Sequence, residues 1–230
     1  MTTAAAHRAS SRPRNIALYG GSFDPIHVGH LAVARAAQRR FHLDEIHFVV
    51  AGRPPHKLKQ DAAPFAHRFA MTALACSGQA HFVPSLAEAG HDFSGRSVHY
   101  SLDTVRHFRH RLGRPGDRLF FLLGVDSFLE IHTWRNYQAL LAACDFIVVS
   151  RPSYHMEPLR RVIPPELLKP SAPQSSRVIH LHRTDVHLLD SVASRVSSSE
   201  VRRRRRRRRP IHGLVPAAVE EYILSQGLYL

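Results

Sequence analysis

The chain has 230 residues, of which 44% are hydrophobic, and a formal net charge of +14 at pH 7. This length allows one substantial hydrophobic core, and no apolar run approaches the roughly 18 residues needed to cross a bilayer, which excludes a membrane-spanning helix. Two cysteines are too few for a disulfide framework and predict buried thiols in a reducing cytoplasm, while the charge predicts an anionic partner: nucleic acid, a membrane surface or a phosphorylated small molecule.

The first 14 residues contain Arg and Ser but no apolar h-region, so we expect a disordered tail there and a single domain over residues 15–230. Apolar, β-rich runs predict strands at 15–20, 45–52, 80–86, 117–124, 145–150 and 177–182. Helical periodicity lies between them, at 29–40, 65–77, 99–112 and 136–143. Strands that alternate with helices predict an α/β fold, with a doubly wound, mostly parallel sheet covered on both faces. Such a sheet binds ligands beyond the carboxyl ends of its strands.

The last third of the chain departs from this alternation. The Pro-rich stretch 151–176 predicts a loop before the last strand. A small C-terminal helical portion follows at 197–227, with one helix ended by Pro210 and a second opened by Pro216.

The segment "YGGSFDPIHVGH", residues 19–30, follows the first predicted strand. We expect Gly20 and Gly21 to adopt backbone conformations closed to other residues. Ser22 and Phe23 can then present amide N–H groups to an anion, at the positive end of the helix that follows. This arrangement suits a phosphate group.

His27 and His30 stand close to one helical turn apart at the start of that helix, with Gly29 between them. Two imidazoles that face one phosphate can donate hydrogen bonds to the charge that develops during phosphoryl transfer. The pair could instead begin a metal site, but no third ligand stands at a suitable spacing.

Seven blocks of the sequence, in order, resemble one family. The blocks are "GGSFDPIHVGH" (20–30), "PPHK" (54–57), "HYSLDTV" (99–105), "GVDSFLEIHTW" (124–134), "VVSRP" (148–152), "VSSSEVR" (196–202) and "VPAAVEEYILSQGLY" (215–229). The first resembles the signature of the HxGH nucleotidyltransferase superfamily, and the set resembles its bacterial nicotinate-nucleotide adenylyltransferases over residues 15–229. The resemblance implies a Rossmann-like nucleotidyltransferase fold. It also implies transfer of AMP from ATP, carried with Mg²⁺, to nicotinate mononucleotide, which yields nicotinate adenine dinucleotide and pyrophosphate in cytoplasmic NAD biosynthesis.

The resemblance also implies roles for individual residues. His27, His30 and Arg202 would be catalytic. The ATP-binding residues would be Gly20, Gly21, Ser22, Phe23, Lys57, Gly124, Asp126, Ser198 and Arg202. The pyridine-nucleotide-binding residues would be Tyr100, Ser101, Thr104, Trp134 and Arg151. No protein metal ligands are implied.

Several of these residues also have a purely structural interpretation. Asp126 would either cap the following helix or bind the ribose or adenine of ATP, and Trp134 would either pack in the core or stack on the nicotinate ring. Asp24 would orient the turn as an Asx-type cap or approach the metal. Arg151 could bind a phosphate or a surface carboxylate.

Four positions depart from the family pattern. His99 stands where the family has Ser, Ser101 where it has Thr, Val125 where it has Ala and Ser199 where it has Thr. The first two lie in the pyridine-binding block, which is where a preference between an acid and an amide would be set.

Arg202–Arg209 is an uninterrupted run of eight arginines. Its front belongs to the "VSSSEVR" block, in which Ser197 or Ser198 can cap the helix and Arg202 would face the triphosphate. The remaining arginines predict a solvated helical face. A nucleic-acid-binding protein on this fold is the alternative from another class, but no stacking aromatics are interleaved in the run as single-strand binders require.

Other HxGH transferases, acting on pantetheine phosphate or with CTP, are nearer alternatives, and the blocks at 124–134 and 196–202 argue against them.

Overall fold

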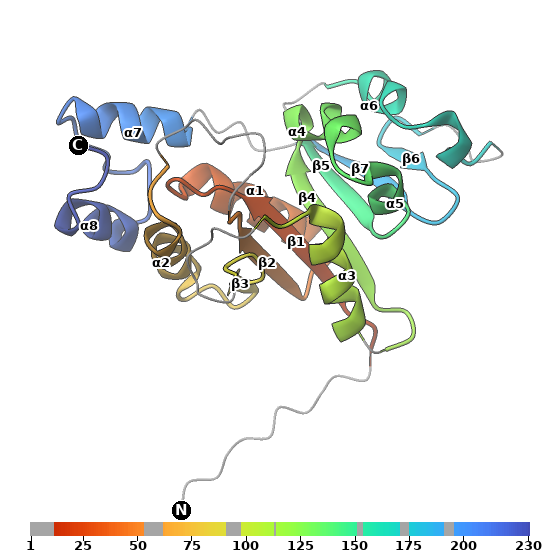
Figure 1. Cartoon of the computed structure of the whole chain (residues 1–230), viewed down its shortest axis with the longest axis horizontal. Coiled ribbons are helices and arrows are strands. Elements are labelled where there is room, and N and C mark those ends of the chain that lie inside the picture. The colour runs from red at the N-terminus through yellow and green to blue at the C-terminus, as the bar shows by residue number, and fades with distance from the viewer. Residues whose placement is uncertain are drawn as a thin grey trace, which may run out of the picture.

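One sheet runs through the computed structural model, which describes residues 12–52, 62–90, 98–112, 114–150, 154–170, 175–190 and 196–230. Among these residues seven strands pair in the order β3-β2-β1-β4-β5-β7-β6 (Figure 1). The strands are β1 (Asn15–Gly21), β2 (Glu45–Val50), β3 (Phe82–Ser85), β4 (Arg118–Gly124), β5 (Asp145–Ser150), β6 (Val178–His180) and β7 (Asp185–Asp190). Every pairing is parallel except that of β6 with β7, which confirms the mostly parallel sheet.

The end of the sheet differs from the prediction. The strand predicted at 177–182 is β6, a short antiparallel edge strand, and the parallel neighbour of β5 is β7, which the sequence analysis missed. β7 begins and ends with Asp185 and Asp190 and contains His187, so it lacks the continuous apolar run that marked the other strands. The prediction therefore took the first arm of a hairpin for the whole strand.

Helices connect the strands. They are α1 (Val28–Phe41), α2 (Phe65–Cys76), α3 (Ser101–Arg111), α4 (Val125–Leu129), α5 (Tyr137–Leu141), α6 (Glu157–Arg161), α7 (Ser198–Arg206) and α8 (Ala217–Ser225), with short 3-10 turns η2 (Ile131–Thr133) and η3 (Pro165–Leu167). The Pro-rich stretch predicted as a loop thus contains α6 and η3. No helix among the described residues is both long and apolar enough to span a membrane.

Two hydrophobic clusters cover opposite faces of the sheet, which confirms the doubly wound architecture. Along β1, Ala17 and Tyr19 face one cluster, with buried residues of α1, α2, α7 and α8. Ile16 and Leu18 face the other, with buried residues of α3, α4, α5 and α6. This alternation follows from the two-residue period of a strand. Figure 1 shows the C-terminal helices α7 and α8 on the same side of the molecule as α2.

The predicted tail is partly attached to the domain. Residues 1–11 lie outside the described residues, but the Arg14 amide donates to Asp117 Oδ1 at 2.8 Å. Arg12 also pairs with Asp44. Residues 12 and 14, which the prediction assigned to the tail, are therefore bonded to the domain.

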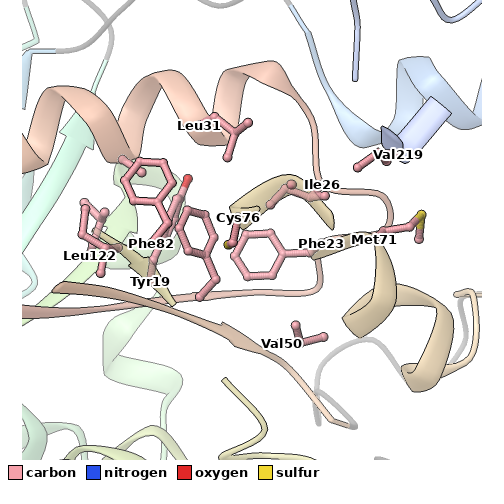
Figure 2. Close-up of a cluster of buried hydrophobic side chains, with 14 of the residues drawn as sticks. Tyr19, Phe23, Ile26, Leu31, Val50, Met71, Cys76, Phe82, Leu122 and Val219 are labelled. Atoms are coloured by element: carbon pink, nitrogen blue, oxygen red, sulfur yellow. The ribbon is translucent and has the colours of Figure 1, made fainter. Parts of the chain in front are cut away.

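The connection from β1 to α1 is anchored in the core. Figure 2 shows Phe23 and Ile26 of this connection pointing into a cluster that also holds Met71 of α2 and Val219 of α8. Phe23 is 1% exposed and Ile26 is fully buried. β1 lies between β2 and β4, where the order of the parallel strands reverses, so this anchored turn stands at the topological switch point of the sheet.

Candidate active site

The positive φ angle in the turn after β1 is not at the glycines, where it was predicted. Gly20 and Gly21 continue β1, and neither has a positive φ; the left-handed conformation falls on Phe23, at φ 45°. Gly21 is needed for space, because a Cβ there would lie 3.0 Å from the buried Phe23 ring. A bulky residue in the left-handed region is strained, and such strain persists only where the surroundings fix it. The packed Phe23 ring supplies that constraint.

His27 and His30 come together, as the spacing predicted. Their rings stack with centroids 3.7 Å apart and an interplanar angle of 29°. His27 is the N-cap of α1, and its backbone N–H donates to His30 Nδ1 at 3.2 Å. The His30 ring also meets the edges of Tyr19 and Phe23. The His27 Nδ1 is buried and has no hydrogen-bond partner among the residues that the structure describes.

Burial keeps both imidazoles neutral. It lowers the pKa of His27 from 6.5 to about 4. Burial, with a smaller contribution from the neighbouring His27, lowers the pKa of His30 well below its ordinary value. A neutral His30 that accepts at Nδ1 must carry its proton on Nε2, so that nitrogen is a hydrogen-bond donor.

Arg68 of α2 holds the backbone around this turn, and the sequence analysis did not single it out. Arg68 is 4% exposed. Its guanidinium donates to four backbone carbonyls, those of Ser22 (2.9 Å), Ala51 (2.7 Å), Gly52 (3.1 Å) and Ala63 (2.9 Å). One signal was present in the sequence: a single arginine within the apolar helix "FAHRFAMTALAC". A cation in such a position must find acceptors.

The N-terminus of α7 contacts the same turn from the other side. Ser197 is the N-cap and accepts from the Glu200 amide at 3.2 Å, which settles the choice between two predicted caps. Ser198 Oγ instead donates to the Pro25 carbonyl at 2.9 Å. Arg202 Nη1 donates to the Asp24 carbonyl at 2.5 Å and lies 3.6 Å from the Asp24 carboxylate.

The other arginines of the run divide into two groups. Arg203 and Arg204 pair with Glu200, and Arg205 Nε donates to the Leu228 carbonyl at 3.4 Å. The four that follow are exposed, at the C-terminal end of α7 and beyond it: Arg206, Arg207, Arg208 and Arg209. Cations there are favoured by the helix dipole, so the run is compatible with a short stable helix.

A cavity of about 420 Å³ opens beside the turn, at the carboxyl ends of β1, β2 and β4. Six of the predicted site residues line it: Gly20, Gly21, Ser22, Tyr100, Ser101 and Trp134. Val49, Phe121 and Leu123 add apolar walls. The cavity therefore has a largely apolar lining, and the β1–α1 turn forms one edge of it. Both features are expected of a nucleotide site.

Aromatic side chains shape the cavity. Trp134 is half-buried and packs edge-on against Phe121, with ring centroids 6.1 Å apart. It therefore both packs on the core and lines the cavity, so the two interpretations are compatible. Tyr100 lies under the guanidinium of Arg135, which is 4.5 Å from the ring centroid and is a second residue that the sequence analysis missed.

Thr104 lies behind the cavity rather than on its surface. Its hydroxyl donates to Glu88 Oε1 at 3.0 Å, and Glu88 does line the cavity. Burial raises the pKa of Glu88, and hydrogen bonds from Thr104 and the Gly52 backbone together with nearby His99 partly oppose that rise. The threonine thus acts on the cavity through a carboxyl group.

Gly124 and Asp126 do not line the cavity. Gly124 is the N-cap of α4, so Asp126 is in the first turn and does not cap this helix. Both are exposed. Lys57 and Arg151 lie outside the described residues.

The Asp24 carboxylate is bonded within the protein. Its Oδ1 accepts from the Tyr229 hydroxyl at 2.6 Å and from the Ala63 amide at 3.2 Å, so this carboxylate already has protein partners. Within the described ranges, no group of three or more His, Cys, Asp or Glu side chains is arranged to hold a metal ion.

A second hollow of about 480 Å³ lies at the opposite end of the sheet, beside Arg118 and Asp145 at the starts of β4 and β5. These two side chains bond to each other at 2.5 Å. Ligands of parallel sheets bind at the carboxyl ends of the strands, so the cavity beside the β1–α1 turn is the better candidate for the active site.

Comparisons with known proteins find relatives over most of the chain. Residues 18–204 match a family described as cytidylyltransferase-like. The chain is 40% identical over 219 residues to a probable nicotinate-nucleotide adenylyltransferase of Moorella thermoacetica, covering 95% of this chain and 93% of that protein. It is 41% identical over 214 residues to one of Solibacter usitatus, covering 93% and 98%. The solved structure of Plasmodium falciparum nicotinic acid mononucleotide adenylyltransferase complexed with NaAD has the same fold, with a TM-score of 0.68, 20% identity and coverage of 94% and 97%.

Proposed function

The chain belongs to the nicotinate-nucleotide adenylyltransferase family, and we propose that it transfers AMP from ATP to nicotinate mononucleotide. The products are nicotinate adenine dinucleotide and pyrophosphate, in the synthesis of NAD. One observation supports this most directly: the apolar cavity and the stacked imidazoles lie on the same β1–α1 turn. A pyridine nucleotide in the cavity and a triphosphate at the imidazoles would meet there.

In the proposed reaction an oxygen of the nicotinate mononucleotide phosphate attacks the α-phosphorus of ATP. A new P–O bond forms as the bond to the pyrophosphate breaks, and its electron pair leaves with the pyrophosphate. No covalent enzyme intermediate is needed. The protein therefore contributes positioning and charge stabilisation.

His27, His30 and Arg202 supply the charge stabilisation in this proposal. The neutral His30 donates from Nε2. The His27 imidazole, which stacks on His30, donates to a phosphate oxygen when it is protonated. A bound triphosphate favours that protonation, since an adjacent negative charge raises the pKa of an imidazole. Arg202, half-buried beside Asp24, adds a fixed positive charge on the α7 side.

The cavity residues bind the acceptor in this proposal. Trp134 offers its ring to the pyridine, with Tyr100 and Ser101 at the start of α3 beside it. ATP would bind through the turn, at Gly20, Gly21, Ser22 and Phe23. It would also contact Gly124, Asp126 and Ser198, as the family resemblance implies. Lys57, Thr104 and Arg151 remain predictions from the family resemblance.

Mg²⁺ enters as part of the substrate, MgATP. The imidazoles and guanidinium at the turn, and the occupied Asp24 carboxylate, fit a metal that arrives on the triphosphate and keeps its waters rather than one held in a protein cage.

The free, buried thiols of Cys76 and Cys144 are compatible with the reducing cytoplasm that we propose as the location of the protein.

The test is pyrophosphate release from MgATP with a panel of acceptors. The proposal predicts turnover with nicotinate mononucleotide, and much less with nicotinamide mononucleotide or phosphopantetheine. Replacement of ATP by CTP should abolish most of it. Preferred use of phosphopantetheine or of CTP would assign the chain to one of the other HxGH activities, and binding of nucleic acid without turnover would support the non-enzymatic alternative.

A further inference from the structure

The end of the chain returns to the β1–α1 turn. Tyr229, the penultimate residue, donates its hydroxyl to Asp24 Oδ1 at 2.6 Å, although 205 positions separate them. Asp24 is 5% exposed and Tyr229 is half-buried. Because water has little access, this bond is the principal side-chain contact of that carboxylate oxygen.

Asp24 connects Tyr229 to Arg202. Its carbonyl accepts from Arg202 Nη1 at 2.5 Å, and its Oδ2 lies 3.6 Å from the same nitrogen. Its Oδ1 is held by Tyr229 and by the Ala63 amide. Tyr229 and Arg202 thus act on the two different oxygens of one buried carboxylate.

The segment that carries Tyr229 is held by a backbone hydrogen bond and by packing against the core. Gly227 and Tyr229 have positive φ angles of 60° and 62°, and the Leu228 amide donates to the Ile223 carbonyl at 3.0 Å. Leu228 and Tyr229 pack against the core cluster of α1, α2 and α8. Burial, the bond to Asp24 and the charge of Asp24 raise the pKa of Tyr229, so the phenol stays protonated and remains a donor.

We propose that Tyr229 is a positioning residue: by holding Asp24 Oδ1 it orients the Asp24 carboxylate and backbone that fix Arg202 toward the triphosphate. Without the hydroxyl, the Asp24 carboxylate can rotate away from its 3.6 Å contact with Arg202, and the guanidinium loses the charge that orients it toward ATP. This inference rests on the proposed adenylyl transfer, in which Arg202 contacts ATP.

The first experiment measures binding, so that it does not depend on turnover. The dissociation constants of α,β-methylene-ATP and of nicotinate mononucleotide are determined by calorimetry for the full-length chain and for Tyr229→Phe. The proposal predicts about tenfold weaker binding of the ATP analogue, within the range of couplings between contacting residues. Binding of nicotinate mononucleotide should change less than about twofold. Equal weakening of both, or of neither, would overturn the proposal.

Tyr222→Phe is the matched control. Tyr222 lies on α8, and its hydroxyl bonds to His67 Nδ1 at 3.0 Å instead of to the turn. The same deletion of one buried phenol oxygen should leave ATP-analogue binding unchanged. If both variants weaken it alike, the effect comes from the general loss of a hydrogen bond in the C-terminal helices and the specific role of Tyr229 is refuted.

Two further variants test the path through Asp24. In an Arg202→Ala background, Tyr229→Phe should add less than about twofold to the loss, because its effect passes through Arg202. Asp24→Asn keeps an oxygen for Tyr229 but removes the charge that faces Arg202, and should weaken ATP-analogue binding even if Tyr229→Phe does not fold. Additive losses in the first case, or wild-type binding in the second, would contradict the path. Failure of the proposed function is distinguishable, since wild-type chain that binds the analogue but forms no dinucleotide would refute the reaction while these comparisons still decide the role of Tyr229.

Discussion

Acid should destabilise this protein through His27. The folded pKa of about 4 lies below the ordinary 6.5, so between these values the unfolded chain binds more protons than the folded one. Stability therefore falls as the pH drops below about 6.5, and this loss is complete near pH 4. At about pH 5 the unfolded histidine is almost fully protonated and the folded one is protonated only to about a tenth, which gives a loss of about 2 kcal/mol from this residue alone. His30 acts in the same direction, because its pKa is also lowered.

The assay compares urea unfolding of the wild type and His27→Asn at about pH 8 and about pH 5. Asn is a good N-cap residue, so the variant keeps the start of α1. Other groups titrate in both proteins, so the difference between the two reports His27 together with its effect on the pKa of the neighbouring His30. The stability of the wild type relative to the variant should fall by about 2 kcal/mol on acidification. An unchanged difference would show that His27 is not held neutral by burial, and the reasoning about the imidazole pair would be wrong.

Three other predictions concern the site. Arg68→Met should lower the free energy of unfolding by about 3 to 5 kcal/mol, because four carbonyls in and beside the turn lose their charged donor; a loss below about 1 kcal/mol in urea denaturation would mean that water replaces it. Trp134→Ala should raise the KM for nicotinate mononucleotide more than that for ATP, and equal changes in steady-state kinetics would indicate packing alone. Arg202→Ala should lower kcat/KM for ATP by about a hundredfold, as for loss of a charge-stabilising donor, while Arg206→Gln with Arg207→Gln should leave it nearly intact; similar losses in both would show that the arginine run acts as a unit.

The sequence allowed the sheet and one half of the site to be predicted well. Strands with continuous apolar runs, such as β4 and β5, were found because burial on both faces leaves a local signal. His27 and His30 were found for a similar reason, since a short spacing on one helix brings them together without tertiary information. β7 was missed because Asp185, His187 and Asp190 leave it without a continuous apolar run.

Contacts between distant segments could not be predicted from the sequence. Arg68 donates to the Ser22 carbonyl, 46 positions earlier in the chain, and Tyr229 donates to Asp24, 205 positions earlier. No local pattern carries such information, although a single arginine in an apolar helix indicates that its guanidinium donates to acceptors elsewhere in the fold. The conformation of the turn was also misassigned, because the buried Phe23 ring imposes the positive φ that was expected at the glycines.

The most direct test of the central claim is the identity of the product formed from MgATP and nicotinate mononucleotide whose phosphate oxygens carry ¹⁸O. Attack by that phosphate on the α-phosphorus predicts, by mass spectrometry, nicotinate adenine dinucleotide that retains all of the label and pyrophosphate that contains none. Unlabelled dinucleotide, labelled pyrophosphate, or no dinucleotide from a folded protein would contradict the proposed reaction.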